Sequence, residues 1–265
     1  MIVEILCVGT ELLSGITLNS NAYWLCGEIT NVGGFVRRVT VVRDDLSEIS
    51  SAARESLARK PRIVITTGGL GATYDDMTLE GIAGALGKKV MIDDRAIEML
   101  KKSYAMHKLH QELTDSQLKM AIIPERSTPI QNPVGTAPAI MDQAGGITIF
   151  CLPGVPSEMK AIFEEQILPR IKKQVGKFVA EELNYNTRGI TEAMIAPVLK
   201  EIVKSHPKNM IYLKTHPRGY YRKKTPQIKI QLISQGDNEK EVKERLDVIS
   251  KVIEKEIVKL GGTIC

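Results

Sequence analysis

Short apolar stretches typical of β-strands alternate with amphipathic helical stretches over roughly the first two-thirds of the chain. The strand candidates are Val3–Val8, Phe35–Val42, Arg62–Thr66, Thr128–Ile130, Ala137–Met141 and Ile147–Leu152. Apolar residues recur at helical spacing in Asn19–Asn31, Leu46–Ala58, Met77–Leu86, Arg95–Leu109, Asp115–Ala121 and Pro156–Lys172. Strands that alternate with helices form right-handed βαβ units. The pattern therefore predicts a three-layer α/β/α domain with a mainly parallel sheet over residues 1–172.

A different pattern follows Lys172. A strand candidate near Phe178–Asn184 precedes a helix at Glu192–Lys204, two hairpin strands and a long amphipathic helix at Glu239–Leu260. The charge changes at the same point: 18 Lys and Arg against 20 Asp and Glu up to Lys172, and 18 against 11 after it. We therefore predict a second, small α+β domain over residues 173–265.

Composition places the chain among cytoplasmic globular proteins. It has 265 residues, of which 43% are hydrophobic, and it has no apolar run long enough to span a bilayer. The first apolar run, Ile2–Val8, contains Glu4 and follows no basic segment, so it indicates a strand rather than a signal peptide. The four cysteines form no CxxC pair, which argues against a zinc or redox motif.

The turn Thr66–Gly71 joins a predicted buried strand to a helix and reads Thr-Thr-Gly-Gly-Leu-Gly. Glycines let a backbone approach a ligand closely, and free N–H groups beside a helix N-terminus favour anions. The turn lacks the Gly-Lys-Ser/Thr ending of a Walker loop, and it is not a Rossmann fingerprint. It predicts a site for a phosphate-bearing, nucleotide-like ligand at the carboxyl end of a strand.

Asp75 and Asp76 follow this turn. Two adjacent acids are more often a helix cap and a solvated side chain, but beside a phosphate cradle they would repel an anion unless a cation bridges them. Mg²⁺ takes one or two carboxylates together with phosphate oxygens, so we expect Asp75 and Asp76 to hold Mg²⁺ or another divalent cation such as Mn²⁺ or Co²⁺.

Further polar loops follow other predicted strands, and Asp44 and Glu11 complete the set of candidate catalytic acids with Asp75 and Asp76. The candidate substrate- and phosphate-binding residues are Asn21, Thr67, Gly68, Gly69, Leu70, Gly71, Thr78, Asn132, Gly135, Thr136, Pro153, Gly154, Pro156 and Glu158. Taken singly, the loops that follow the first two strands are more often helix caps than ligand contacts, and the loops at Asn132–Pro138 and Leu152–Glu158 are explained equally well by simple turn chemistry. Their shared position at strand ends favours a common pocket.

Four segments together resemble the molybdopterin-binding, MoaB/Mog-like domain, and most closely its branch in the competence/damage-inducible protein A (CinA) family. They are GTELLSG with NSN at Gly9–Asn21, TTGGLGATYDDMT at Thr66–Thr78, NPVGTAP at Asn132–Pro138 and LPGVPSEM at Leu152–Met159. Two positions depart from the family pattern: Ala72 stands where proline is usual, and Ala139 where glycine is usual. The tail is similar to the KH-type domain of CinA proteins, with Thr187–Glu192 as its best segment. The nicotinamide-nucleotide amidase domain that continues many such chains is not expected here.

The resemblance implies one of two activities. The CinA branch includes divalent-metal-dependent pyrophosphatases that act on ADP-ribose-like dinucleotides, and the molybdenum-cofactor branch binds molybdopterin and transfers an adenylyl group to it. The first implies a hydrolase in which Asp76 matches the key aspartate, Asp44 a second acid, and a metal-bound water attacks phosphorus. The second implies a protein of molybdenum cofactor biosynthesis. A nucleotide-binding protein without chemistry is a third alternative.

We expect the partners to be a small-molecule nucleotide substrate and further copies of the chain, in a dimer or trimer, with no membrane. The basic and aromatic segment His216–Lys224 is of a kind found in single-strand nucleic-acid binders. We do not expect nucleic-acid binding, because no Gly-x-x-Gly loop follows Lys172. His107 and His110 have metal-ligand spacing but no evident third ligand, so we predict a surface or packing role for them.

Overall fold

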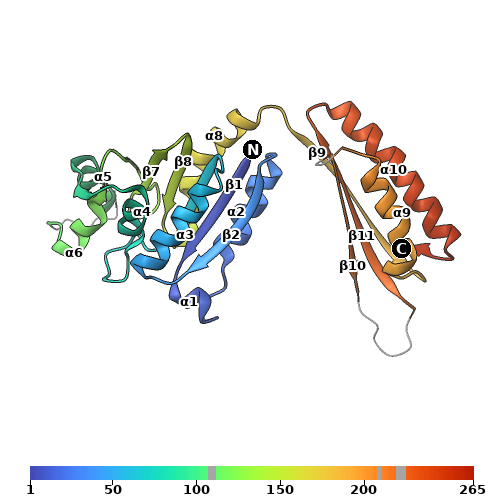
Figure 1. The fold of residues 1–265 in the computed structure, drawn as a ribbon, viewed down its shortest axis with the longest axis horizontal. Helices are drawn as coiled ribbons and strands as arrows, with labels where there is room; N and C mark the ends of the chain where they lie inside the picture. The colour runs from blue at the N-terminus through green and yellow to red at the C-terminus, as the bar shows by residue number, and fades with distance from the viewer. Residues whose placement is uncertain (107–111, 208–209, 219–224) are drawn as a thin grey trace. The chain divides into compact units, whose positions relative to one another are not determined.

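The computed structural model describes residues 1–106, 112–207, 210–218 and 225–265. They form two compact units, Met1–Val175 and Gly176–Cys265. The first is a sheet between two sets of helices, and the second is a sheet with two helices on one face (Figure 1). The predicted fold class, a mixed α/β domain with a mainly parallel sheet and a smaller second domain, is confirmed.

The first unit is built on a six-stranded sheet in the order β2-β1-β3-β8-β7-β6. Its strands are β1 (Ile2–Val8), β2 (Phe35–Val42), β3 (Ile63–Thr67), β6 (Thr128–Ile130), β7 (Ala139–Ala144) and β8 (Ile147–Leu152). The four strands β2, β1, β3 and β8 are parallel, whereas β7 and β6 are antiparallel to their neighbours. All residues of β3 are buried, as expected of a central strand covered on both faces.

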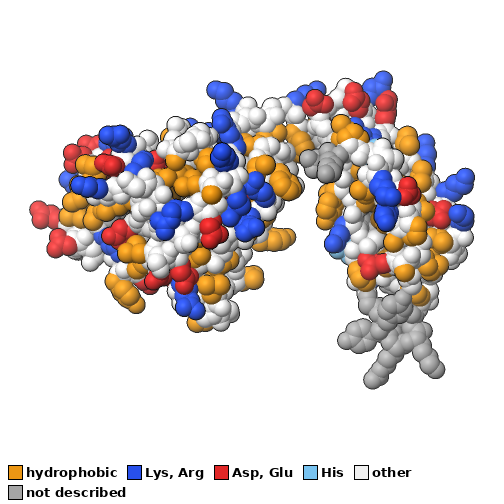
Figure 2. Space-filling view, viewed as in Figure 1, with side chains coloured by type: hydrophobic (Ala, Val, Ile, Leu, Met, Phe, Trp, Pro, Cys, Tyr) orange, Lys and Arg blue, Asp and Glu red, His pale blue; other side chains and the backbone are white. Residues whose placement is uncertain are grey.

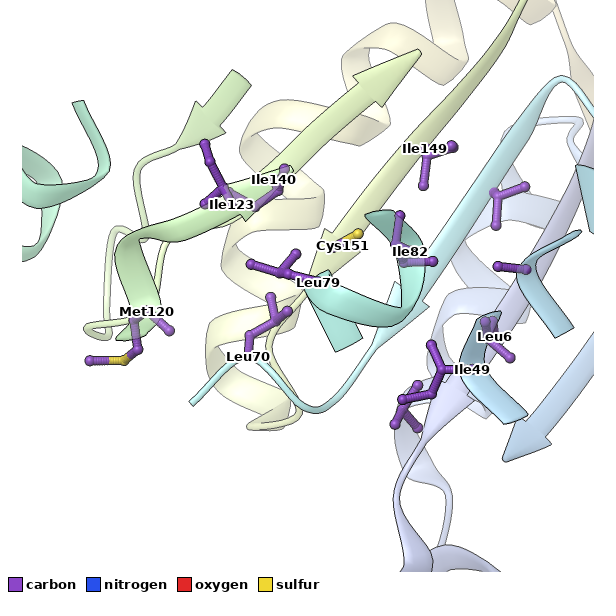
Figure 3. Close-up of a cluster of buried hydrophobic side chains, with 14 of the residues drawn as sticks. Leu6, Ile49, Leu70, Leu79, Ile82, Met120, Ile123, Ile140, Ile149 and Cys151 are labelled. Atoms are coloured by element: carbon purple, nitrogen blue, oxygen red, sulfur yellow. The ribbon is translucent and has the colours of Figure 1, made fainter. Parts of the chain in front are cut away.

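Helices cover both faces of this sheet. They are α1 (Thr10–Leu13), α2 (Ser20–Asn31), α3 (Leu46–Ala58), α4 (Thr78–Leu86), α5 (Asp94–Met106), α6 (Asp115–Leu118), α7 (Pro156–Ile162) and α8 (Leu168–Val175). Leu6, Val8 and Val64 point to a core shared with α3, α4 and α5, shown in Figure 3. Alternate strand residues such as Ile5 and Ile65 point to a second core, shared with α2, α7 and α8. The period-two alternation along the strands thus fills both cores.

The structure interrupts the helix that the sequence predicts at Pro156–Lys172. A π-helical turn, η2 (Phe163–Ile167), separates α7 from α8. Pro169 has no N–H to donate to the carbonyl one turn earlier, which accounts for a change of hydrogen-bonding pattern just before it. The short strands β4 (Val90–Ile92) and β5 (Ile122–Pro124) were not predicted. The helix predicted at Asp115–Ala121 consists of α6 followed by a 3₁₀ turn, η1 (Lys119–Ala121).

Glu4 is a charged residue buried in the central strand β1, with 3% of its side chain exposed. Arg37 on β2 donates to it at 2.6 Å, Arg59 after α3 donates at 2.9 Å and the Ser56 hydroxyl donates at 2.8 Å. Burial raises the pKa of Glu4, but the hydrogen bonds from Arg59, Ser56 and Arg37 outweigh it and lower this pKa below its usual value. The ionised carboxylate therefore ties β1, β2 and α3 together.

The second unit has the element order β9 (Val179–Arg188), α9 (Glu192–Lys204), β10 (Ile211–Pro217), β11 (Gln227–Gly236), α10 (Glu239–Lys259) and β12 (Thr263–Ile264). Its sheet order is β10-β11-β9-β12, with all pairs antiparallel. This β-α-β-β-α-β arrangement is the split-βαβ, ferredoxin-like one. A KH-type assignment for this unit stays a prediction.

The core of the second unit lies between its sheet and its two helices. Ile228, Ile230 and Leu232 of β11 are buried against Ile195 of α9 and Ile253 of α10. None of the helices formed by the described residues combines the length and apolar character that a bilayer crossing requires. Acidic and basic side chains intersperse on the face shown in Figure 2, so the positive charge of the tail does not gather there into one patch.

Candidate functional site

The glycine-rich turn at the end of β3 adopts a conformation that requires glycine. Gly68 has φ +103° and Gly69 has φ +65°. A Cβ at Gly68 would lie closer than 3.0 Å to the carbonyl oxygen of Val8, and one at Gly69 equally close to the Thr78 hydroxyl. Beneath the turn, the Thr78 hydroxyl donates to the Gly68 carbonyl at 2.8 Å, and the Thr78 N–H donates to the Gly69 carbonyl at 3.1 Å. Thr78 is fully buried and supports the turn from the first residue of α4.

Three consecutive backbone N–H groups of this turn have no acceptor among the residues that the structure describes. Gly68 donates to the Leu152 carbonyl at 3.1 Å. In contrast, the N–H groups of Gly69, Leu70 and Gly71 donate to no acceptor within the described part of the chain. Successive free N–H groups in a turn form a concavity that binds anions. Of the four residues in the predicted anion cradle, Gly68–Gly71, the last three thus have N–H groups without an acceptor among the described residues.

A cavity of about 270 Å³ opens at the carboxyl ends of β1, β3 and β8. The sequence-predicted residues that line it are Glu11, Asn21, Asp44, Thr67, Gly68, Gly69, Asp75, Asp76, Gly154 and Pro156. The Asn21 amide donates to the Thr67 hydroxyl at 2.9 Å and to the Gly154 carbonyl at 2.8 Å, which ties the start of α2 to the ends of β3 and β8. The loops that follow β1, β2, β3 and β8 thus meet at this cavity, as expected for an open parallel sheet, whereas the 132–138 loop does not line it.

All charged residues in the lining of this cavity are acidic. Asp44 accepts from the Thr10 N–H at 2.7 Å, and the carboxylate of Glu11 folds back over Gly9. Asp76 accepts from the Thr73 N–H at 2.8 Å and from the Thr73 hydroxyl at 2.6 Å. The Thr73 hydroxyl also donates to Asp75, and this bond is the main reason that the pKa of Asp75 lies below its usual value. The four acids of this cavity would therefore repel an anionic ligand unless a cation lies between them.

A second cavity, of about 210 Å³, is also lined by residues of the Gly69–Met77 loop. It shares Gly69 and Asp76 with the first cavity, and it also includes Leu70 and Gly71. Its remaining lining is apolar apart from Glu80 and Lys119. The Lys119 ammonium donates to the carbonyl oxygen of Thr73, so it holds the loop that carries both aspartates.

The remaining predicted residues line neither cavity. Asn132 is fully buried, and its amide donates to Glu158 at 2.6 Å and to the Ala137 carbonyl at 3.0 Å, while its oxygen accepts from the Gly135 N–H at 2.8 Å. A Cβ at Gly135 would collide with Glu158. These contacts fix the 132–138 loop onto α7. The Pro153 carbonyl accepts from the Thr67 hydroxyl at 3.0 Å, and Thr136 is half-buried in the same loop as Gly135.

Sequence reasoning missed Thr73, Lys119, and the lining residues Leu12, Thr17 and Leu18. Thr73 could have been predicted from the sequence, since a threonine between the glycine-rich turn and two acids can donate hydrogen bonds to both carboxylates. Lys119 had none, because it follows the turn by more than forty residues. His107 and His110 lie outside the described residues. Within the described ranges, no three His, Cys, Asp or Glu side chains gather closely enough to hold a metal ion without help from a ligand.

Comparisons with known proteins agree with the architecture of the first unit. The sequence profile of the family described as "Probable molybdopterin binding domain" matches residues 4–173. A protein from Sulfurisphaera tokodaii is 43% identical over 262 residues, which cover 98% of this chain and 97% of that protein. A crystal structure of the protein CinA, of unknown function, from Thermoplasma acidophilum is 42% identical with a TM-score of 0.58, over 66% of this chain and 99% of that one.

The match corrects one prediction and confirms another. The prediction of a metal-dependent, ADP-ribose-type nucleotide pyrophosphatase is wrong, because the family that matches is defined by molybdopterin binding. The glycine turn and acids suit either ligand class, so residue chemistry alone did not separate the two. The predicted MoaB/Mog-like domain is confirmed. The chain belongs to the family of the probable molybdopterin binding domain and, in its first unit, is CinA-like.

Proposed function

We propose that the protein binds a phosphate-bearing pterin of the molybdopterin type in the first unit, with the phosphate on the glycine-rich turn. The observation that carries this proposal is the row of N–H groups at Gly69, Leu70 and Gly71, which have no acceptor among the described residues. Gly69 lines the cavity at the strand ends, and all three residues line the second cavity. Three N–H donors suit the oxygens of a phosphate. The polar wall at the start of α2, with Asn19 and Ser20, offers hydrogen-bonding partners to the edge of a ring such as a pterin.

Two acids of the first cavity could hold a divalent cation beside the ligand's phosphate. Asp75 and Asp76 are half-exposed and adjacent, and each accepts from Thr73 through one carboxylate oxygen, Oδ1 of Asp75 and Oδ2 of Asp76. Mg²⁺ prefers such oxygen ligands and keeps coordination positions for water and phosphate. On these two residues it would neutralise the acids and bridge them to the ligand's phosphate.

A direct test is a fluorescence titration of the full chain with neopterin phosphate and with neopterin, which have the same ring and differ in the phosphate. We expect the phosphate form to bind at least about tenfold more tightly, since charge-assisted hydrogen bonds are the strong ones. AMP, added as a competitor, should displace the pterin poorly. Equal affinities for both pterins, or efficient displacement by AMP, would refute a phosphopterin site.

The metal is tested by Asp76→Asn. With the wild-type chain, Mg²⁺ should strengthen binding of neopterin phosphate relative to EDTA, and it should leave neopterin unchanged. Asp76→Asn keeps an acceptor for Thr73 but removes the charge that a hard cation prefers, so most of this Mg²⁺ effect should disappear. Asp94→Asn, at the exposed start of α5, is the matched loss of one negative charge and should keep it. A full Mg²⁺ effect in Asp76→Asn would exclude Asp76 as a ligand.

A further inference from the structure

The first and second cavities share two lining residues, Gly69 and Asp76. The three free N–H groups divide unequally between them: Gly69 lines both cavities, whereas Leu70 and Gly71 line only the second. Two of the three residues therefore belong to the lining of the second cavity alone. Four acids line the first cavity, whereas two acids, Asp76 and Glu80, line the second, so an anion in the second cavity meets fewer negative charges.

Lys119 is the one lysine or arginine among the described residues that line these two cavities. It lies at the start of η1, with its side chain half-buried and its ammonium on the carbonyl oxygen of Thr73. Thr73 is exposed, so water can replace the ammonium on that carbonyl at little cost. The ammonium gains more from an anion, because hydrogen bonds between two charged groups are stronger than those to a neutral oxygen.

The remaining walls indicate how the anion is held. Leu70, Met77, Val90, Met120 and Ile122 give the second cavity an apolar lining, in which a charge pair is less screened than at an exposed surface. A flexible lysine on one side and backbone N–H groups on the other would grip one compact anion, such as a phosphate, from two directions.

We propose that the second cavity is the anion subsite of this ligand-binding site, in which Lys119 leaves the Thr73 carbonyl and pairs with the ligand's phosphate over the N–H groups of Gly69, Leu70 and Gly71. This rests on the proposed function for the identity of the ligand, but not for the presence of an anion subsite. The uncharged ring of the ligand then lies in the first cavity. Because Lys119 otherwise holds Thr73, binding of the phosphate also releases the loop that carries Asp75 and Asp76.

The test compares Lys119→Met, Lys119→Arg and the control Lys101→Met, an exposed lysine on α5, in the full chain. We expect Lys119→Met to weaken neopterin phosphate roughly tenfold and to reduce the salt dependence of its binding, while neopterin changes less than about twofold. Lys119→Arg should retain most of the affinity, and Lys101→Met should match the wild type. Equal losses for both pterins would show that Lys119 only holds the loop, and no loss would show that it does not touch the ligand; either result overturns the proposal.

A second probe separates this inference from the proposed function. Inorganic pyrophosphate, titrated by calorimetry, presents the anion without a ring. If pyrophosphate binds the wild type more tightly than Lys119→Met and neopterin phosphate does not bind, the anion subsite is supported and the pterin assignment is wrong. If neopterin phosphate binds equally to the wild type and Lys119→Met, the pterin assignment stands and the subsite falls. Binding of neither probe by the wild type overturns both. Thermal unfolding checks that each variant is folded.

Discussion

Gly68→Ala is expected to destabilise the first unit by about 3 kcal/mol and to abolish ligand binding. The new Cβ would lie closer than 3.0 Å to the backbone carbonyl of Val8, which cannot move without distorting β1, and φ +103° is strained for any other residue. For a unit of this size the melting temperature should fall by roughly 10 °C. Trp24 is the single tryptophan, and it packs edge-on against Phe163 with 5.4 Å between the ring centroids. Its fluorescence therefore reports unfolding of the first unit.

Gly87→Ala is the matched control for this prediction. Gly87 ends α4 with φ +65°, but a Cβ there meets no atom within 4 Å. Alanine should therefore carry only the strain of the left-handed conformation, about 1 kcal/mol, and leave ligand binding intact. Similar losses of unfolding free energy for the two variants would mean that the close approach to Val8 contributes little and that the backbone of β1 shifts to make room for the Cβ.

Glu4→Gln is expected to destabilise the first unit by about 2 to 3 kcal/mol at neutral pH. The substitution keeps the shape of the side chain but places an amide donor among the donors of Arg37, Arg59 and Ser56. Glu55→Gln is the control, because Glu55 pairs with the same Arg59 at 3.6 Å but is 64% exposed. An exposed pair of this kind contributes about 0.5 kcal/mol or less.

The effect of Glu4→Gln should depend on pH in a defined direction. Because folding lowers the pKa of Glu4, its contribution is complete above the unfolded value near 4.5 and is lost as the pH falls through the lower folded value. In urea unfolding, the difference in the free energy of unfolding between the wild type and Glu4→Gln should therefore be large at pH 7 and should become smaller below pH 4.5. A difference that is constant between pH 7 and pH 3 would assign the loss to packing rather than to charge.

The elements that sequence predicted well are those with a long periodic signal. Phe35–Val42, Leu46–Ala58 and Glu192–Lys204 coincide with β2, α3 and α9, because each repeats its apolar positions over at least two periods. The three-residue strands β4 and β5 are too short to show alternation, and they pair only because η1 brings Ile122 beside Ile92. The π-helical turn depends on one proline, which the sequence pattern treated as part of a continuous helix.

The residues of the candidate site were likewise predictable only where they lie close together in the sequence. Gly68, Gly69, Asp75 and Asp76 are close in sequence, so their local chemistry was visible and they do line the first cavity. The buried contacts of Asn132 with Glu158 depend on how the 132–138 loop packs against α7, which no local pattern encodes. Lys119 reaches Thr73 only through the tertiary fold, and sequence reasoning therefore assigned the positive charge of the site to a metal alone.

The strand order of the first unit has a consequence for how the chain folds as it is made. β3 lies between β1 and β8, and its Ile63 pairs with Thr148 of β8. One side of this buried strand therefore has no partner until residues much later in the chain have been synthesised. Until Leu152 has left the ribosome, the unpaired side of β3 is an apolar edge open to other chains. Non-local parallel pairing of this kind folds slowly. The nascent first half is therefore the stage at which this protein most needs protection from aggregation.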